Sequence, residues 1–593
     1  MTPSFGASLL AHNRARFRLW APNLNAVSVQ IQDAVQIQGA GEIQGAGELP
    51  MARLADGWFE TEAPAHAGTR YRFRVSPDLL VPDPASHAQA GGVHDASIVV
   101  DHNAFDWRHT AWRGRPWHET VLYEIHPGAV GGFAGITEQL PELAALGITA
   151  IELMPIAAFP GGRNWGYDGV LLYAPASEYG TPKDLKLLID TAHGLNLMVM
   201  LDVVYNHFGP EGNYLGAYAK DFYRDDITTP WGDALDIRSP IVRKFFIENA
   251  IHWLTNYRFD GLRLDAVHAI NDESFLRDLA RQARAATPGR HIHLVLENEA
   301  RNAALLNAET YDAQWSDDWH HCLHVLLTGE VENYYRDYAD GTAARLAHCL
   351  AEGFDYQGQS SMHRQGHKLG TPSGHLPPTR FIHFLQNHDH IGNRAFGERL
   401  TAIASPDAVR AATVLLLLSP HIPMLFMGQE WAATAPFPFF TGFEGELASA
   451  VRDGRRREFA GFAAFADPAR RDTIPDPNHP ATFAASTPRR GERLDPSHAA
   501  WLVLHRDLLA IRASQIVPRL PGTTTISAAA LDTAAVIARW RMGDGAELTI
   551  AANVGPNPSR CPRLEGETLF ALNGAGDPTL PAHSAIATLK PAA

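Results

Sequence analysis

Short apolar runs separated by longer amphipathic stretches dominate the chain from about residue 117 to residue 430. The runs have the length of strands, whereas the stretches 135–147, 181–196 and 239–257 carry apolar residues at helical spacing. The last of these stretches begins with Ser-Pro, a favoured start for a helix. Alternating strands and helices indicate a parallel sheet that is covered on both faces, and eight such units would close a (β/α)8 TIM barrel.

Seven of these apolar runs are visible, and we expect an eighth within 311–321. The runs are VLYEIHPG (121–128), ITAIELMPI (148–156), LNLMVMLDVVYNH (195–207), FDGLRLDAVH (259–268), HIHLVLENEA (291–300), FIHFLQNHD (381–389) and IPMLFMGQE (422–430). Each run turns polar at its C-terminal end. In a closed parallel barrel these ends meet at one mouth, where such folds build their sites. The sequence therefore predicts an α/β fold with one polar site at the mouth of a barrel over residues 101–515.

The segments on either side of the barrel carry the pattern of β structure. Residues 14–100 contain RFRLW, VSVQI, WFETE and RYRFRV, which alternate with period two and predict an N-terminal β-sandwich domain over 1–100. A loop in it repeats the hexapeptide IQGAGE at 37–42 and 43–48, which we interpret as a duplicated surface turn. Near the other end, AVIARWRM and ELTIAANV flank GDGA, a hairpin signal, so 516–593 is predicted to be a small antiparallel β domain.

Composition narrows the classes of function. The net charge of -15 over 593 residues argues against a nucleic-acid partner and against binding to anionic membranes. The chain has three cysteines, and this low, odd number does not suit a disulfide framework and fits a reducing cytoplasm. The N-terminus lacks the pattern of a signal peptide, and no stretch reaches the ~20 apolar residues of a membrane span. We expect a soluble, cytoplasmic protein.

Three acids stand out among the polar strand ends: Asp265, Glu297 and Asp389. A pair of carboxyl groups is what glycoside hydrolysis requires, one to attack or stabilise the anomeric carbon and one to protonate the leaving oxygen. Arg263 lies two residues before Asp265, on the same side of the strand, and is expected to lower the pKa of Asp265 and keep it ionised. The apolar run LVLEN is expected to raise the pKa of Glu297, as an acid catalyst needs.

Further polar and aromatic residues near the strand ends suit a sugar site. Asn206, His207, His268 and His388 offer hydrogen bonds to hydroxyl groups without a fixed charge. Five aromatic residues near strand ends are candidates for stacking on pyranose rings: Trp165, Tyr167, Trp231, Trp315 and Trp319. No HExxH spacing, Cys pair or phosphate-binding glycine motif occurs, so the sequence predicts neither a catalytic metal nor a cofactor.

In four short regions the chain resembles the α-amylase family of glycoside hydrolases. They are DVVYNH (202–207), GLRLDAVH (261–268), LVLEN (294–298) and FLQNHD (384–389), and their order and spacing make the resemblance specific. The resemblance implies that Asp265 is the nucleophile, Glu297 the general acid/base and Asp389 the stabiliser of the transition state in a retaining mechanism. It also implies that Arg263, His207 and His388 line the subsite of the attacked glucose.

Within that family the chain is most similar to the group that cleaves the α-1,4 bond next to the terminal trehalose of malto-oligosyltrehalose. The supporting segments include NWGYDG, TPWGDALD, DAQWSDDWHHCLHVLLTGE and QNHDHIGNR, and the N-terminal domain resembles the early-set, immunoglobulin-like domain of these enzymes. The resemblance implies substrate contacts in three segments and in the loop of Trp165 and Tyr167. Their residues are Arg263, Leu264, Asp265, Ala266, Val267 and His268; Asp317, Asp318, Trp319, His320 and His321; and His388, Asp389, His390, Ile391, Gly392 and Asn393.

Three positions depart from the pattern of that group. The loop at 129–134 is short, Glu299 stands where Asp is typical, and His390 stands where Gln is typical. All three lie outside the proposed catalytic acids, so they bear on the subsites more than on the reaction.

Two other functions remain open on the sequence. One is a different α-glucan enzyme of the same architecture, a branching or isoamylase-type debranching enzyme, because the barrel chemistry is shared. The other is a non-catalytic glucan-binding protein, against which the intact set of three acids argues. The resemblance further implies a functional link to a malto-oligosyltrehalose synthase, and we expect a monomer.

Overall fold

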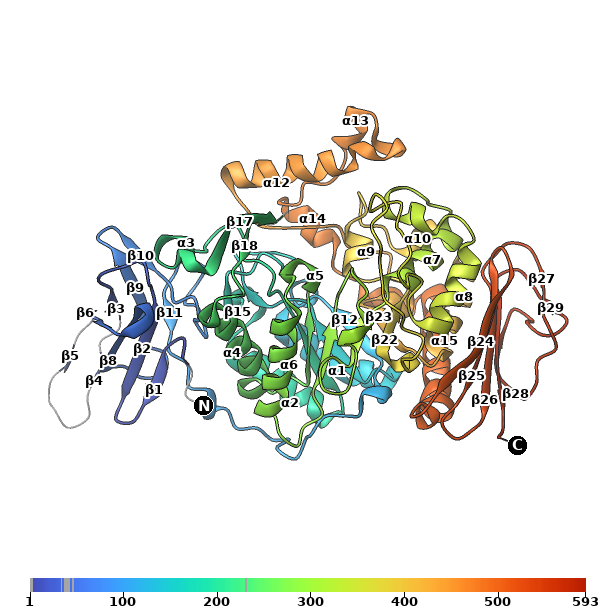
Figure 1. Ribbon diagram of the computed structural model, residues 1–593, viewed down its shortest axis with the longest axis horizontal. Coiled ribbons are helices and arrows are strands. Elements are labelled where there is room, and N and C mark those ends of the chain that lie inside the picture. The colour runs from blue at the N-terminus through green and yellow to red at the C-terminus, as the bar shows by residue number, and fades with distance from the viewer. Residues whose placement is uncertain (1–3, 33–34, 37–42, 45–46, 230–231, 593) are drawn as a thin grey trace.

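The structure is a computed structural model, which describes residues 4–592 except 33–34, 37–42, 45–46 and 230–231. Three parts lie in a row: the N-terminal sheets at one end, the barrel in the centre and the C-terminal sheet at the other end (Figure 1). Trp231 and the first copy of IQGAGE lie outside the described residues, so the predictions made for them stay untested.

The N-terminal part consists of two antiparallel sheets. One has the order β1-β2-β8-β7 and the other β10-β9-β3-β6, with β11 paired to β9. The strands are β1 (Ser8–Leu10), β2 (Arg14–Trp20), β3 (Ser28–Ile31), β6 (Gly47–Pro50), β7 (Ala52–Arg53), β8 (Trp58–Pro64), β9 (Arg70–Ser76), β10 (Leu79–Val81) and β11 (Ser97–Ile98). Phe17 of β2 and Tyr71 of β9 pack edge-on between the sheets, with ring centroids 4.8 Å apart. The apolar residues of the period-two pattern therefore form the inner faces of a β-sandwich.

Eight parallel strands close the central barrel, as the sequence predicts. They are β12 (Leu122–Ile125), β13 (Ala150–Leu153), β16 (Met198–Val203), β19 (Gly261–Leu264), β20 (His293–Leu296), β21 (Ala313–Trp315), β22 (Phe381–Phe384) and β23 (Ile422–Phe426). The eighth strand expected within 311–321 is β21, which is short because a helix begins two residues after it.

The inside of the barrel changes from apolar to polar toward its mouth. Residues two apart on a strand point to the same side, so Leu122 and Glu124 both face inward, as do Met200 and Asp202. Leu122 and Met200 belong to an apolar cluster that fills the lower barrel together with Val295 and other strand residues. On seven of the eight strands the next inward position carries a polar group, and β23 is the exception with Phe426, so the polar groups lie together at the mouth.

Helices cover the outside of the barrel. The main ones are α1 (Gly132–Leu146), α2 (Pro182–Gly194), α4 (Pro240–Asn256), α6 (Glu273–Ala286), α7 (Asp317–Thr328), α8 (Thr342–Glu352), α11 (Pro406–Leu418) and α15 (Pro496–Ile511). Helix α4 begins at the predicted Ser-Pro, with Pro240 in its first turn, although the Ser239 side chain makes no capping hydrogen bond. Helix α2 starts with a capping box, in which Thr181 and Asp184 each accept the other's backbone N–H.

An insertion between β23 and α15 covers the barrel mouth. It contains α12 (Gly445–Glu458), α13 (Pro468–Arg471) and α14 (Pro480–Ala485), and Figure 1 shows α12 and α13 projecting above the barrel. The apolar and polar pattern of the sequence gave no indication that this segment reaches the site.

The C-terminal domain is an antiparallel sheet of order β24-β25-β26-β30-β28. Its strands are β24 (Thr524–Asp532), β25 (Ala535–Arg541), β26 (Glu547–Asn553), β28 (Glu567–Leu572) and β30 (Ser584–Lys590). The predicted hairpin is β25 and β26, which pair Ala535 with Asn553. The hydroxyl of Thr525 donates to the carbonyl of Ala351 on α8, which holds β24 against the barrel.

The described residues contain no helix that combines the length and apolarity needed to cross a membrane. Cys322, Cys349 and Cys561 are buried free thiols.

Candidate active site

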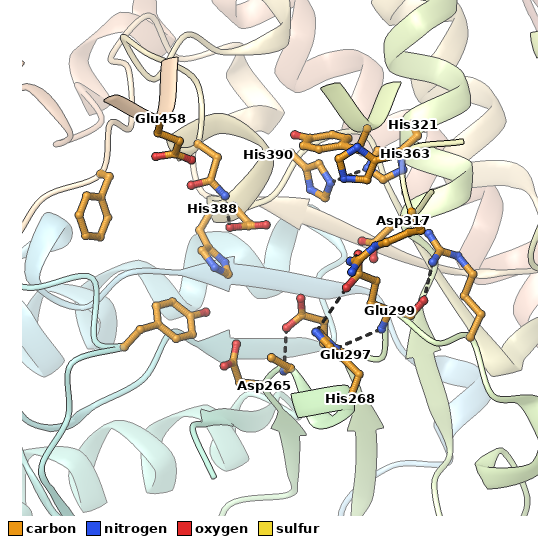
Figure 2. Close-up of a pocket in the computed structure, with 18 of the residues that line it drawn as sticks. Asp265, His268, Glu297, Glu299, Asp317, His321, His363, His388, His390 and Glu458 are labelled. Carbon is orange, nitrogen blue, oxygen red and sulfur yellow. Dashed lines mark hydrogen bonds and ion pairs between the residues drawn. The ribbon is translucent and has the colours of Figure 1, made fainter. Parts of the chain in front are cut away.

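A cavity of about 610 Å³ opens at the C-terminal ends of the barrel strands. Figure 2 shows that Asp265, Glu297 and His388 lie on its lower side and that His321, His363 and Glu458 lie above them. Fourteen of the residues predicted from the sequence line it: Trp165, Tyr167, His207, Arg263, Asp265, Ala266, His268, Glu297, Asp317, His321, His388, Asp389, His390 and Asn393.

Arg263 lies at the centre of the charged groups, with only 1% of its side chain exposed. Its Nη1 donates to Asp202 Oδ2 at 2.5 Å and to Asp265 Oδ1 at 3.0 Å. Its Nη2 donates to Glu297 Oε2 at 2.5 Å. The face of the guanidinium lies 4.0 Å from the centre of the Trp315 ring. One planar cation therefore fixes three carboxylates in place, which a single ammonium group does less well.

Asp265 and Glu297 are oriented by further hydrogen bonds. The Asn206 amide donates to Asp265 Oδ2 at 2.8 Å and to the Asp265 carbonyl at 3.0 Å. The backbone N–H of Ala266 donates to Glu297 Oε2 at 3.0 Å. Ala266 has φ 39° and ψ 48°, a left-handed conformation that side chains other than glycine rarely adopt. This strained residue turns its N–H toward Glu297, and strain of this kind concentrates at functional sites.

The acid–base balance of Asp265 differs from the prediction. Burial raises the pKa of Asp265 above its ordinary value, and it outweighs the lowering by Arg263 and Asn206, so the predicted net lowering is wrong. Burial likewise raises the pKa of Asp389. Below them, burial and the neighbouring Glu124 and Asp202 raise the pKa of Glu152 well above its ordinary range. Glu152 is therefore protonated more readily than an ordinary glutamate, which reduces the negative charge beneath Arg263.

His388 is held by a residue of the first barrel strand. Its ring Nδ1 lies 2.5 Å from Glu124 Oε1, and its backbone N–H donates to Glu124 Oε2 at 3.0 Å. Burial lowers the pKa of His388, but Glu124 more than offsets it and the net shift is upward. The ring stacks on Tyr167, whose hydroxyl donates to Asp202 at 2.6 Å. Glu124 was not among the predicted site residues, although its position at a polar strand end marked it.

Nine described residues predicted as contacts or stacking platforms do not line the cavity: Asn206, Leu264, Val267, Trp315, Asp318, Trp319, His320, Ile391 and Gly392. Asn206 acts through Asp265, as described above. Gly392 leaves room for Trp165, since a Cβ at this position would lie 1.9 Å from the Trp165 ring.

The segment DDWHH explains most of the remaining differences. It forms the first turns of α7, where residues four apart share a face, so Asp317 and His321 line the cavity together. Asp318 turns inward, where it accepts a hydrogen bond from Arg301 Nε at 2.6 Å. Trp319 is fully buried and stacks on His383, and His320 hydrogen-bonds the Leu385 carbonyl at 2.8 Å. These three side chains support the site from behind.

Thirteen residues that line the cavity were not predicted as contacts: Glu299, Arg301, Tyr334, Asp337, Tyr338, Ser361, His363, Arg364, Leu369, Phe439, Val451, Arg455 and Glu458. Of these, Glu299 had been noted only as a departure from the family pattern, and it pairs with Arg364 and lies near His268. Most come from loops and from α12, whose sequence carries no periodic signal that points to the mouth. A second departure, His390, also lines the cavity, and its hydrogen bonds go to Asn387 and His321 and not to the carboxylates.

The fold and the matching family model define the class of protein. Residues 121–233 match the model for the alpha amylase catalytic domain, and residues 525–587 match a domain of unknown function. The chain is 42% identical over 507 residues to malto-oligosyltrehalose trehalohydrolase of Deinococcus radiodurans, covering 84% of this chain and 80% of the relative. It is 35% identical over 579 residues to the Mycobacterium tuberculosis protein of the same name, covering 94% and 95%.

A crystal structure of a Salmonella typhimurium protein described as an alpha amylase superposes with a TM-score of 0.92 over 100% of both chains, at 41% identity. The protein is thus a glycoside hydrolase of the α-amylase type. More closely, the chain belongs to the malto-oligosyltrehalose trehalohydrolase family.

Proposed function

We propose that this enzyme hydrolyses the α-1,4-glucosidic bond next to the terminal trehalose unit of malto-oligosyltrehalose. The products are trehalose and a malto-oligosaccharide shortened by that unit. The observation that carries the proposal is the arrangement around Arg263, which joins Asp265 and Glu297 through two different nitrogens in one cavity. The relatives named above supply the substrate class.

In this proposal Asp265 is the nucleophile and Glu297 the general acid/base of a retaining reaction. Retention requires the two carboxyl groups to be about 5–5.5 Å apart, whereas inversion needs about 6.5–9.5 Å to admit a water molecule. Asp265 and Glu297 accept hydrogen bonds from the two terminal nitrogens of one guanidinium, at 3.0 and 2.5 Å, and this close link favours retention. Glu297 first protonates the leaving oxygen and then, as carboxylate, activates the water that releases the glycosyl group from Asp265.

Asp389 and the residues around it are proposed to hold the attacked glucose. The Asn393 amide donates to Asp389 Oδ1 at 2.6 Å and leaves Oδ2 free to accept a sugar hydroxyl. Arg263 supplies positive charge beside the acids, and the raised pKa of His388 makes this ring easier to protonate than an ordinary histidine. His207 and Tyr167 complete this subsite, with His207 Nε2 3.0 Å from the Tyr167 carbonyl.

The wider setting is proposed on the same basis. The buried free thiols fit a reducing cytoplasm, and a monomer suffices because every proposed catalytic group comes from one chain. A trehalose-ended substrate requires an enzyme that first converts the reducing end of a maltodextrin, so we propose a functional link to a malto-oligosyltrehalose synthase.

Product analysis tests the reaction. Purified enzyme is incubated with maltopentaosyl-trehalose and, separately, with maltohexaose. We expect trehalose from the first substrate and little product from the second. Cleavage or transfer on maltohexaose without trehalose release would instead assign a branching or debranching activity, and no product from either would favour a non-catalytic glucan-binding protein.

A further inference from the structure

Three histidines that are far apart in the sequence meet outside the catalytic cavity. His87 and His102 lie in the connector between the N-terminal sheets and the barrel, and His252 lies on α4. One ring nitrogen of each lies within 4.8 Å of those of the other two. In the described part of the chain this is the one group of three or more His, Cys, Asp or Glu side chains with such spacing. None of the three lines the catalytic cavity.

The spacing is close to what a metal ion requires. His102 Nε2 lies 3.2 Å from His87 Nδ1. An ion about 2.0–2.1 Å from each ligand in a tetrahedral site needs nitrogens roughly 3.3 Å apart, so this pair already meets the requirement. The His252 ring lies with its centre 4.5 Å from that of His87 and 5.1 Å from that of His102. The ligand nitrogens all lie within 4.8 Å of one another, so the third must approach by up to about 1.5 Å to complete a tetrahedral set.

The rings are in the state that binds metals. Burial lowers the pKa of His87 to about 4 and that of His102 to about 2, and it lowers the pKa of His252 well below its ordinary value. All three are therefore neutral at pH 7 and carry a nitrogen lone pair. The Asn256 amide bonds His252 Nδ1, whereas His252 Nε2 is buried without a hydrogen-bond partner among the described residues, an arrangement that costs free energy when nothing satisfies it.

We propose that His87, His102 and His252 form a binding site for a divalent transition-metal ion of the Zn²⁺ class. Three neutral imidazoles suit Zn²⁺, Ni²⁺ and Cu²⁺ rather than Mg²⁺ or Ca²⁺, which prefer oxygen ligands. His87 and His102 are half-buried and His252 is buried, and water would supply the fourth ligand. The ion would tie the connector to α4 and so fix the N-terminal domain against the barrel. This role is structural and independent of the sugar chemistry at the mouth.

One neighbouring charge opposes the ion. The Lys186 ammonium donates to the His102 carbonyl at 2.7 Å. This hydrogen bond holds the ammonium group beside the three rings, so its charge is expected to weaken cation binding. The sequence pattern did not reveal the site, because its ligands lack the short spacing of HExxH or paired-Cys motifs.

The test is a metal titration of the full-length protein, purified without a polyhistidine tag and stripped with a chelator. Isothermal titration with Zn²⁺ should give one tight equivalent per chain, and Co²⁺ should give the visible absorption of a tetrahedral site. His87→Gln and His102→Gln should each lose this equivalent. Both residues are half-buried, and circular dichroism checks that each variant folds.

A matched control separates the site from the many other histidines. His498 is also half-buried and hydrogen-bonds the Trp431 carbonyl, so His498→Gln should keep the equivalent. Lys186→Met should bind Zn²⁺ more tightly, because it removes the opposing charge. The proposal is overturned if the stripped protein takes up no stoichiometric Zn²⁺, if the His87 and His102 variants bind as well as the wild type, or if Lys186→Met fails to tighten binding.

Discussion

The two sides of the catalytic cavity are built in different ways. One side, the catalytic floor, consists of Asp202, Arg263, Asp265 and Glu297 at the ends of neighbouring barrel strands, tied together by the hydrogen bonds of a single guanidinium. The other side, the loop wall, consists of side chains from α7, the segment 329–369 and α12, which include Asp317 and Arg455.

The comparison separates chemistry from selectivity. The floor residues are fixed by strand register and by charge pairs, so they can hold the reacting groups rigidly, as catalysis requires. The wall residues are carried by the helices α7 and α12 and by the loops between strands and helices above the barrel, where substrate recognition is usually placed. We therefore expect floor substitutions to change kcat and wall substitutions to change KM or the preference for a trehalose end.

The largest expected effect is at the floor. Asp265→Asn keeps the shape of the side chain but removes the nucleophilic charge, so kcat for trehalose release should fall by about 10³-fold or more. The measurement is initial rate on maltopentaosyl-trehalose, with circular dichroism to show that the fold is intact. Asp225→Asn, an exposed acid on β17 (Tyr223–Thr229), should behave as the wild type. A folded Asp265→Asn enzyme with wild-type kcat would remove Asp265 from the mechanism.

A smaller loss of kcat is expected when the hydrogen bonds between Arg263 and the acids are weakened. Arg263→Lys keeps the charge but replaces the planar fork, which cannot then bond Asp202, Asp265 and Glu297 together. We expect kcat to fall about 100-fold, which corresponds to about 2.7 kcal/mol, with KM less affected. Arg243→Lys is the control, since Arg243 pairs with Asp272 away from the cavity. A pure increase in KM would show that Arg263 binds substrate and does not organise the acids.

The catalytic floor could be predicted from the sequence to a larger extent than the loop wall. Arg263 and Asp265 lie two apart on a strand, so one short pattern placed both on the inner face and the closed barrel brought Glu297 beside them. The net pKa of Asp265 was not predictable, because the depth of burial depends on the whole fold. In α7 the sequence could not tell which residues of DDWHH face the cavity, because that depends on how the helix is rotated. The approach of α12 depends on tertiary packing alone.

A substitution in the loop wall is expected to cause an intermediate loss of activity. Arg455 on α12 lines the cavity and its Nη2 donates to the Gly392 carbonyl at 2.6 Å, so it joins the wall to the helix that carries Asp389. Arg455→Met should lower kcat/KM for the trehalose-ended substrate about 10-fold, mainly through KM. Arg452→Met on the same helix does not touch the cavity and serves as the control. A fall in kcat alone would contradict the division between floor and wall.

The smallest effect is a pH dependence of the wall. Burial raises the pKa of Asp317 to about 7, with Arg301 opposing it and Glu297 adding to it. The carboxyl group is therefore mostly protonated below about pH 6 and mostly ionised above about pH 8. Asn resembles the protonated form, so Asp317→Asn and the wild type should have similar kcat/KM at pH 6.

As the pH rises through 7, the wild type gains a negative charge at the wall that the variant lacks. A carboxylate accepts hydrogen bonds from sugar hydroxyls but can no longer donate one, so kcat/KM of the two proteins should separate by about 3-fold at pH 8. The measurement is kcat/KM from pH 5.5 to 8.5 for both proteins, because this ratio reports the ionisation of the free enzyme. Parallel profiles across pH 7 would mean that Asp317 does not meet the substrate, and the selective role of the wall would then rest on Arg455 and its neighbours.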